Sequence, residues 1–151
     1  MSSKYIRDEM VSYLQTTYPT HSIVDISGEY ELQQDFLAQQ GITPQDEWTA
    51  VDFIGSDEIP TTITSTNTTG RYRETGNVFI HVVYPARTTA KASILSRAEI
   101  YRDGLRGSRI NNDIIVESVT PPNFGAGASL EFDGGYISAT FVISYYRDKN
   151  L

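Results

Sequence analysis

The sequence predicts an α+β fold: a mixed, largely antiparallel β-sheet with helices packed against it, in a single domain over residues 1–151. Three observations predict it. Apolar residues recur at three- and four-residue spacing in three segments, which indicates amphipathic helices. Runs rich in β-branched and aromatic residues with a period of two indicate roughly six or seven strands. Turn signals between several of these runs indicate hairpins, and a chain of 151 residues is long enough to bury a real core.

The N-terminal part predicts two helices on either side of a short strand. The first helix covers residues 2–18, begins at a possible Ser3 cap and ends before Pro19. Its apolar face consists of Ile6, Met10 and Leu14. A strand at residues 23–27 and a second, shorter helix at residues 29–41 are expected to follow.

The apolar period then changes to two. Residues 48–55 and 59–66 are predicted strands, and the Gly-Ser-Asp-Glu segment at residues 55–58 supplies the turn between them. A polar loop at residues 65–76 is expected to precede a strand at residues 77–84. Both faces of that last strand are largely apolar, which fits a strand covered on two sides.

Residues 86–107 contain the strongest helix pattern in the chain. Thr88 or Thr89 can cap its start, and Gly107 follows its end. Its apolar stripe consists of Ala90, Ile94, Ala98, Tyr101 and Leu105. A strand at residues 112–119 comes next.

The C-terminal part, residues 128–146, predicts a hairpin. Asp133-Gly134-Gly135 is a strong turn signal. Apolar residues alternate on both sides of it: Leu130, Phe132, Ile137, Ala139, Phe141 and Ile143. The chain's last predicted strand therefore follows this turn.

Composition excludes several classes of protein. A hydrophobic content of 39% and a charged content of 21% are near globular averages. A net charge of −7 argues against a general nucleic-acid binder, because phosphate contacts need a basic surface. The absence of cysteine excludes disulfides and thiolate zinc sites. With no long apolar run and no apolar segment after Lys4, synthesis in the cytoplasm is the simplest expectation.

The sequence predicts no catalytic residue, no cofactor and no metal site. His21 follows a turn and is expected to be a solvated loop histidine, whereas His81 lies in a strand and is expected to be structural. No nucleophile elbow, metalloprotease motif or phosphate-binding loop is present. Asp52, Asp57 and Glu58 lack the ligand spacing of a calcium loop, so a solvated turn is the better interpretation.

Tyrosine is unusually frequent, with ten tyrosines against one tryptophan. Tyrosine is enriched at interfaces because its ring is apolar and its hydroxyl is polar. Tyr72, Tyr145 and Tyr146 are therefore candidate contact residues. Tyrosines that line the edge of a sheet remain an equally good interpretation.

The order of elements from residue 48 to residue 148 forms a recognisable pattern. A tryptophan-led strand and a polar loop with Gly and Arg precede the motif G-x-V-x-I-x-V-x-x-P at residues 76–85. A Thr-rich turn then enters an alanine-containing helix that ends near a Gly, and "DGGYISATFVISYYRD" forms the last strand. This succession resembles the tail-terminator proteins of long-tailed bacteriophages, of the lambda type. Residues 21–46 depart from the resemblance, because they are longer than the family's usual lead-in.

The resemblance implies a structural virion protein at the head–tail junction, with no enzymatic activity. Such a protein forms a ring, usually a homohexamer, that caps the tail tube and stops its polymerisation. A tail-tube protein lies on one face of the ring and a head-completion or connector protein on the other. DNA passes through the lumen without specific binding, and an acidic lumen would keep it from sticking.

A set of interface residues is predicted for such a ring. It includes two cations near the start of the helix at residues 86–107, which oppose its dipole and which an acidic partner or solvent screening could offset. In the loop at residues 65–76, arginine and tyrosine side chains are expected to reach a neighbouring subunit or an axial partner. The whole predicted set is Arg71, Tyr72, Arg73, Glu74, Arg87, Lys91, Tyr145 and Tyr146. A solvated hairpin tip is the alternative for the loop. For the protein as a whole, the alternatives are another ring-forming virion part (a tail-tube or head-completion protein), or a small α+β hydrolase or ligand-binding module.

Overall fold

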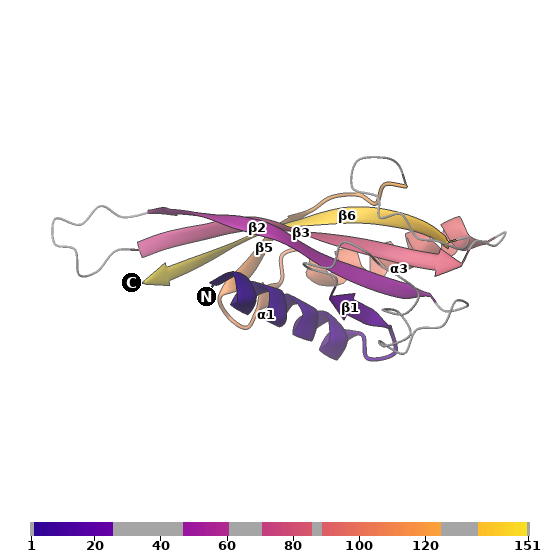
Figure 1. Cartoon of the computed structure of the whole chain (residues 1–151), viewed down its shortest axis with the longest axis horizontal. Coiled ribbons are helices and arrows are strands. Elements are labelled where there is room, and N and C mark those ends of the chain that lie inside the picture. Colours follow the sequence, from indigo (N-terminus) through magenta and orange to yellow (C-terminus); the bar gives the residue numbers. More distant parts are fainter. Residues whose placement is uncertain (1, 26–46, 61–70, 86–88, 125–135, 151) are drawn as a thin grey trace.

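The computed structural model describes residues 2–25, 47–60, 71–85, 89–124 and 136–150. It confirms the α+β class, because the described residues form a six-stranded mixed sheet and two helices. The elements in chain order are α1 (Ser2–Thr17), β1 (Ile23–Asp25), β2 (Trp48–Pro60), β3 (Arg71–Pro85), α3 (Ala90–Leu105), β4 (Arg109–Ile110), β5 (Ile114–Val119) and β6 (Tyr136–Asn150) (Figure 1).

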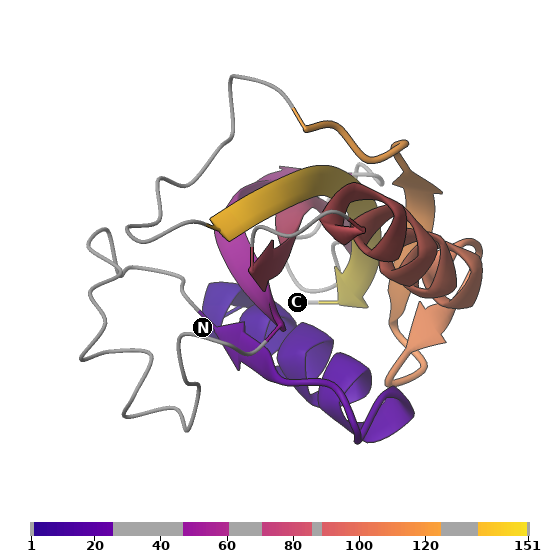
Figure 2. The ribbon, with the colours of Figure 1, turned by 90° about the vertical axis from the view of Figure 1, so that its right-hand side faces the viewer.

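The strand order across the sheet is β1-β2-β3-β6-β5-β4. Only the β1–β2 pair is parallel among the described strands, and the other pairs are antiparallel. β3 and β6 pair along their full length, from Arg71 opposite Asn150 to Pro85 opposite Tyr136. The sheet is strongly twisted and curved, as Figure 2 shows. Its two central strands are therefore the longest and the most completely paired.

Both helices pack against the same face of the sheet. The apolar stripes predicted from helical spacing are buried in this core: Ile6, Met10 and Leu14 from α1, and Ala90, Ile94, Ala98, Tyr101 and Leu105 from α3. Alternate residues of β3 and β6 complete it: Val78, Ile80, Val82, Ala139, Phe141 and Ile143. Each large apolar side chain buried in this way contributes about 1.5–3 kcal/mol.

The opposite face of the sheet also buries side chains near its centre. Trp48, Ala50 and Val83 are fully buried there, and His81 is 1% exposed. The prediction that the strand around residues 77–84 is covered on both faces is therefore confirmed.

β2 differs from the predicted hairpin, because it runs through residues 55–58 without turning. A β-bulge between Phe53 and Gly55 shifts the register, and the pairing with β3 then continues to Pro60 opposite Tyr72. The turn prediction was wrong because Gly, Ser and Asp favour turns only where no neighbouring strand holds the backbone extended. Here β3 supplies such a neighbour, and Pro60 ends the strand.

β3 begins earlier than predicted. Residues 71–76 were expected in a polar loop, yet they pair with β2 on one side and with β6 on the other. The ends of three strands therefore form an arm, defined here as residues 55–60, 71–77 and 144–150. Figure 1 shows this arm reaching beyond the first turn of α1.

The ends of the helices differ in detail from the sequence predictions. α1 begins at Ser2, so Ser3 lies within its first turn and does not precede it. Thr89 is the N-cap residue of α3, but its side chain makes no capping hydrogen bond. Gly107 follows α3 with φ +71°, the left-handed conformation that favours glycine after a helix. The helix predicted at residues 29–41 and the first strand of the hairpin predicted at residues 128–146 lie outside the described residues.

Candidate functional site

Arg73 lies in the arm and is held by its own chain. Its Nε donates to Asp148 Oδ1 at 2.8 Å and its Nη2 to Asp148 Oδ2 at 3.0 Å. Asp148 is the residue directly opposite on β6, and the guanidinium also lies 4.2 Å from the ring centroid of Tyr146. The hydrogen bonds that Arg73 donates to Asp148 raise the pKa of Arg73 above its usual range. The pair links β3 to β6 and so stiffens the arm. Both side chains are half-exposed, so part of each charged group remains at the surface.

Glu74 was predicted in an exposed loop, and the structure corrects this prediction. Its side chain is 2% exposed because, in a strand, it shares the face of Val78 and Ile80, which points to the helices. Within the described part of the chain, its Oε1 has no hydrogen-bond partner. Glu74 therefore belongs to the interior of the arm and is not a surface contact.

The two tyrosines predicted as contacts have different environments. Tyr145 is 1% exposed and belongs to the core, where its ring lies 6.4 Å from that of Phe53. The prediction of Tyr145 as an interface residue is thus wrong, because strand alternation directs it to the helix-covered face. Tyr146 points to the other face, half-buried beneath Arg73. Gly76 stands opposite Tyr145 on β3.

The structure places the other predicted interface residues separately. Arg71 and Tyr72 lie in β3, opposite Asn150 and Lys149, and only their backbones are described. Lys91 is exposed in the first turn of α3, with its ammonium 5.7 Å from the ring centroid of Phe124. Arg87 lies outside the described residues. The structure therefore brings Arg71 and Tyr72 together with Arg73 in the arm, whereas Lys91 lies on α3.

A polar network fixes the base of the arm to α1. Arg147 Nε donates to Asp113 Oδ2 at 2.9 Å, and Tyr5 OH donates to Asp113 Oδ1 at 2.8 Å. Asn111 Nδ2 donates to Tyr5 OH at 2.9 Å. Burial and the bond to Asp113 raise the pKa of Tyr5. Asn111 and Asn112 have φ of 49° and 66°, which shows the tight left-handed turn that presents Asp113. The network joins α1, the β4–β5 turn and β6.

His81, expected to be a structural histidine, is buried in the sheet. Its Nδ1 lies 2.7 Å from Thr140 Oγ1 on the neighbouring strand. Its Nε2 is buried without a hydrogen-bond partner in the described part of the chain. Burial lowers the pKa of His81 from 6.5 to about 4, so the ring is neutral at pH 7. Its hydrogen-bond partner is the hydroxyl of Thr140. A carboxylate in that place would have favoured the hydrolase alternative, because a carboxylate orients the histidine of a catalytic triad.

His21 lies in a loop, as predicted, but it is not simply solvated. It is half-buried, and its ring stacks on Tyr18 at 5.5 Å between centroids. His21 Nδ1 lies 2.7 Å from Tyr101 OH, which lies 2.9 Å from the buried Thr49 Oγ1. Burial, followed by the charge of Arg97, lowers the pKa of His21 below 6.5. The ring is therefore oriented by hydrogen bonds that lead through Tyr101 to the buried Thr49.

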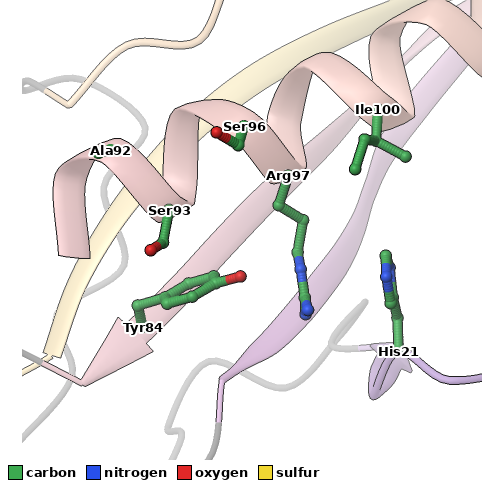
Figure 3. Close-up of a pocket in the computed structure, with 7 residues that line it drawn as sticks. All are labelled: His21, Tyr84, Ala92, Ser93, Ser96, Arg97 and Ile100. Atoms are coloured by element: carbon green, nitrogen blue, oxygen red, sulfur yellow. The ribbon is translucent and has the colours of Figure 1, made fainter. Parts of the chain in front are cut away.

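His21 lines an open cavity of about 370 Å³ beside α3. From α3 come Ala92, Ser93, Ser96, Arg97 and Ile100, and from β3 comes Tyr84. Figure 3 shows Arg97 extending between Tyr84 and His21, with Ser93 pointing toward Tyr84. The guanidinium lies 5.3 Å from the ring centroid of Tyr84 and 3.6 Å from Glu47 Oε1.

This cavity is not among the sites predicted from the sequence. Its signal is present in the chain, because Ser93, Arg97 and Ile100 repeat at helical spacing beside the apolar stripe of α3. His21 and Tyr84 join them only through the fold, and their sequence positions gave no indication of it. A second cavity of about 370 Å³, between α1 and β4, is lined by Glu9, Ile110, Asn111 and the hydroxyl groups of four residues of α1, and no Lys or Arg is among these described lining residues.

No group of three His, Asp or Glu side chains is placed to hold a metal ion in the described ranges. Among the helices that the structure describes, none has the length and apolarity needed to cross a membrane. Asp52, one of the acidic residues considered above, is half-buried on β2, and burial followed by the charge of Asp25 raises its pKa.

Comparisons with known proteins do not assign this chain to a family. No protein-family model matches the sequence, and no curated protein matches it. Fourteen chains of solved structures do match. One of them, a protein that carries no functional name, aligns over 95% of this chain and 90% of its own length, with a TM-score of 0.40 and 13% identity. At that level the likeness supports no inference about this chain.

Proposed function

We propose that the protein is a ring-forming structural protein of a phage virion, a tail terminator that caps the tail tube, stops its polymerisation and forms the joint to the head connector. It acts through contact surfaces at the head–tail junction and has no catalytic role. The observation that carries the proposal is the arm, a three-stranded extension that reaches beyond the helices. The order of elements and the motif at residues 76–85 also support the proposal, because both resemble those of tail-terminator proteins.

The arm is suited to contact a neighbouring subunit. Its backbone is paired before assembly, and the Arg73–Asp148 pair links two of its strands. The Asp113 network holds the base of the arm to the body of the domain. Binding through a preformed element costs little ordering entropy. A ring needs a head-to-tail contact of this kind, in which one face of a subunit meets a different face of the next.

The outer edge of the arm supports the same proposal. β1 pairs only with residues 49–51 of β2. From residue 52 to residue 60, that edge of β2 has no partner among the described strands. An edge of this length presents backbone N–H and C=O groups, which a strand from a second chain can pair with. Pro60, at its end, limits the length of such pairing.

Electron microscopy of the purified protein, alone and with tail tubes, tests the proposal. We expect discrete rings, and a single ring at one end of each tube. Added to polymerising tube protein, the rings should stop growth at the length reached. Open-ended stacking of the purified protein into tubes would instead identify a tube subunit. Monomers that bind no tube would refute the proposal.

A further inference from the structure

We infer that the cavity beside α3 is a carboxylate-binding pocket, occupied in the assembled ring by an acidic side chain of a neighbouring copy of the same chain. This inference extends the proposed function, because it assigns the residues that receive the subunit contact. It is carried by the groups that line the cavity: one guanidinium, two serine hydroxyls and an imidazole.

Arg97 supplies the charge. Its side chain is only 15% exposed, and the ring of Tyr84 holds it in the cavity. Within the described part of the chain its only ionic contact is Glu47, at 3.6 Å. That distance exceeds the length of a hydrogen bond, so the guanidinium N–H groups keep their capacity to bind a carboxylate in a bidentate arrangement.

Three further groups can donate to the same oxyanion. Ser93, one turn before Arg97, presents its hydroxyl group on the same side of α3, and Ser96 also lines the cavity. His21 uses Nδ1 for its bond to Tyr101, which leaves Nε2 for a ligand in the cavity. Figure 3 shows Ser93, Arg97 and His21 on the same side of α3. A cation flanked by neutral donors is the arrangement that recognises a carboxylate or a similar oxyanion.

A second copy of the chain is the occupant that the charges favour. Each copy carries 19 acidic residues against 12 basic ones, so its surface is rich in carboxylates. Two copies with a net charge of −7 repel each other, and a ring therefore needs local cationic contacts at each interface. Ile100, at the cavity and 51% exposed, adds an apolar surface that a protein partner would cover.

Acetate is the first probe, and it tests the pocket without assembly. In NMR titrations of the isolated chain we expect saturable shifts at the Arg97 side-chain N–H and at the Ser93 and Ser96 amides. Arg97→Gln should weaken acetate binding about tenfold or more, the effect of losing a charged hydrogen-bond partner. Glu47→Gln should strengthen it, because the competing carboxylate is gone. Absence of saturable shifts in the parent protein would refute the pocket.

Ring assembly is the second test, with Arg106→Gln as the matched control. Arg106 follows α3, pairs with Asp103 at 3.6 Å and does not line the cavity. Arg106→Gln therefore removes the same charge as Arg97→Gln, but away from the cavity. Arg97→Gln should lower the fraction of ring by at least about tenfold at equal concentration, and Arg106→Gln should not. Acetate binding with normal assembly of Arg97→Gln would overturn the neighbouring copy as occupant. If the parent protein forms no ring, the proposed function and that occupant both fail, while the acetate titration still decides whether the pocket binds carboxylates.

Discussion

His81 gives a prediction whose size follows from the structure. The ring is 1% exposed, hydrogen-bonded to Thr140, and its pKa is lowered to about 4 by burial. In the unfolded chain the pKa returns to about 6.5. Between these two values the unfolded state binds a proton that the folded state does not. Stability contributed by the neutral ring is therefore complete above pH 6.5 and is lost as the pH falls toward 4.

The magnitude comes from proton linkage at a single site. With pKa values of about 4 and 6.5, the free energy of unfolding should fall by about 2 kcal/mol between pH 7 and pH 5, and by about 3 kcal/mol between pH 7 and pH 4. Asp52 works in the opposite direction, because its raised pKa favours the folded state as the pH falls. It remains present in every variant compared, so its contribution cancels in a difference.

Urea unfolding at pH 4, 5, 6 and 7 measures the effect, with His81→Asn as the comparison. The asparagine amide can keep a hydrogen bond to Thr140 but does not titrate. The parent protein should lose about 3 kcal/mol more than the variant between pH 7 and pH 4. His21→Asn is the control, since His21 is only half-buried and its removal should change the pH dependence less. Equal pH dependence of the parent protein and His81→Asn would refute the argument.

Three other changes test the core, a helix end and the arm. Ile94→Asp and Phe141→Asp each bury an unpaired charge, and both should abolish soluble folding; an unchanged melting temperature would contradict the core assignment. Gly107→Ala should cost about 1 kcal/mol in urea unfolding, because φ of +71° strains any residue with a Cβ; no loss would show that the turn relaxes. Arg73→Glu, which places a carboxylate opposite Asp148, should yield folded subunits that fail to cap tails on complementation; tails of normal length joined to heads would show that the arm makes no essential contact.

The periodic parts of the fold could be predicted from the sequence. The stripe from Ala90 to Leu105 is buried residue for residue, because helical spacing alone determines which side of a helix meets a core. The alternation from Ala139 to Ile143 determines the buried face of β6 in the same way. Local patterns of this kind depend on few neighbours.

The errors concern segments whose conformation depends on distant partners. Residues 71–76 are polar and were assigned to a loop, yet two flanking strands hold them in the sheet. Once that stretch is extended, Glu74 must face the core and Arg73 must face Asp148. His21 was misjudged for the same reason, since its partner Tyr101 lies on α3. No local pattern carries this information.

The position of β6 has a consequence for the order of folding. β6 is a late segment of the chain, but it lies between β3 and β5 in the sheet. Until it is synthesised, β1, β2 and β3 form one group and β4 and β5 another, with open backbone edges on β3 and β5. Such edges favour aggregation, and pairing between residues far apart in sequence is slow. Insertion of β6 is therefore the step that joins the two groups of strands into a single sheet and ends the exposure of both edges.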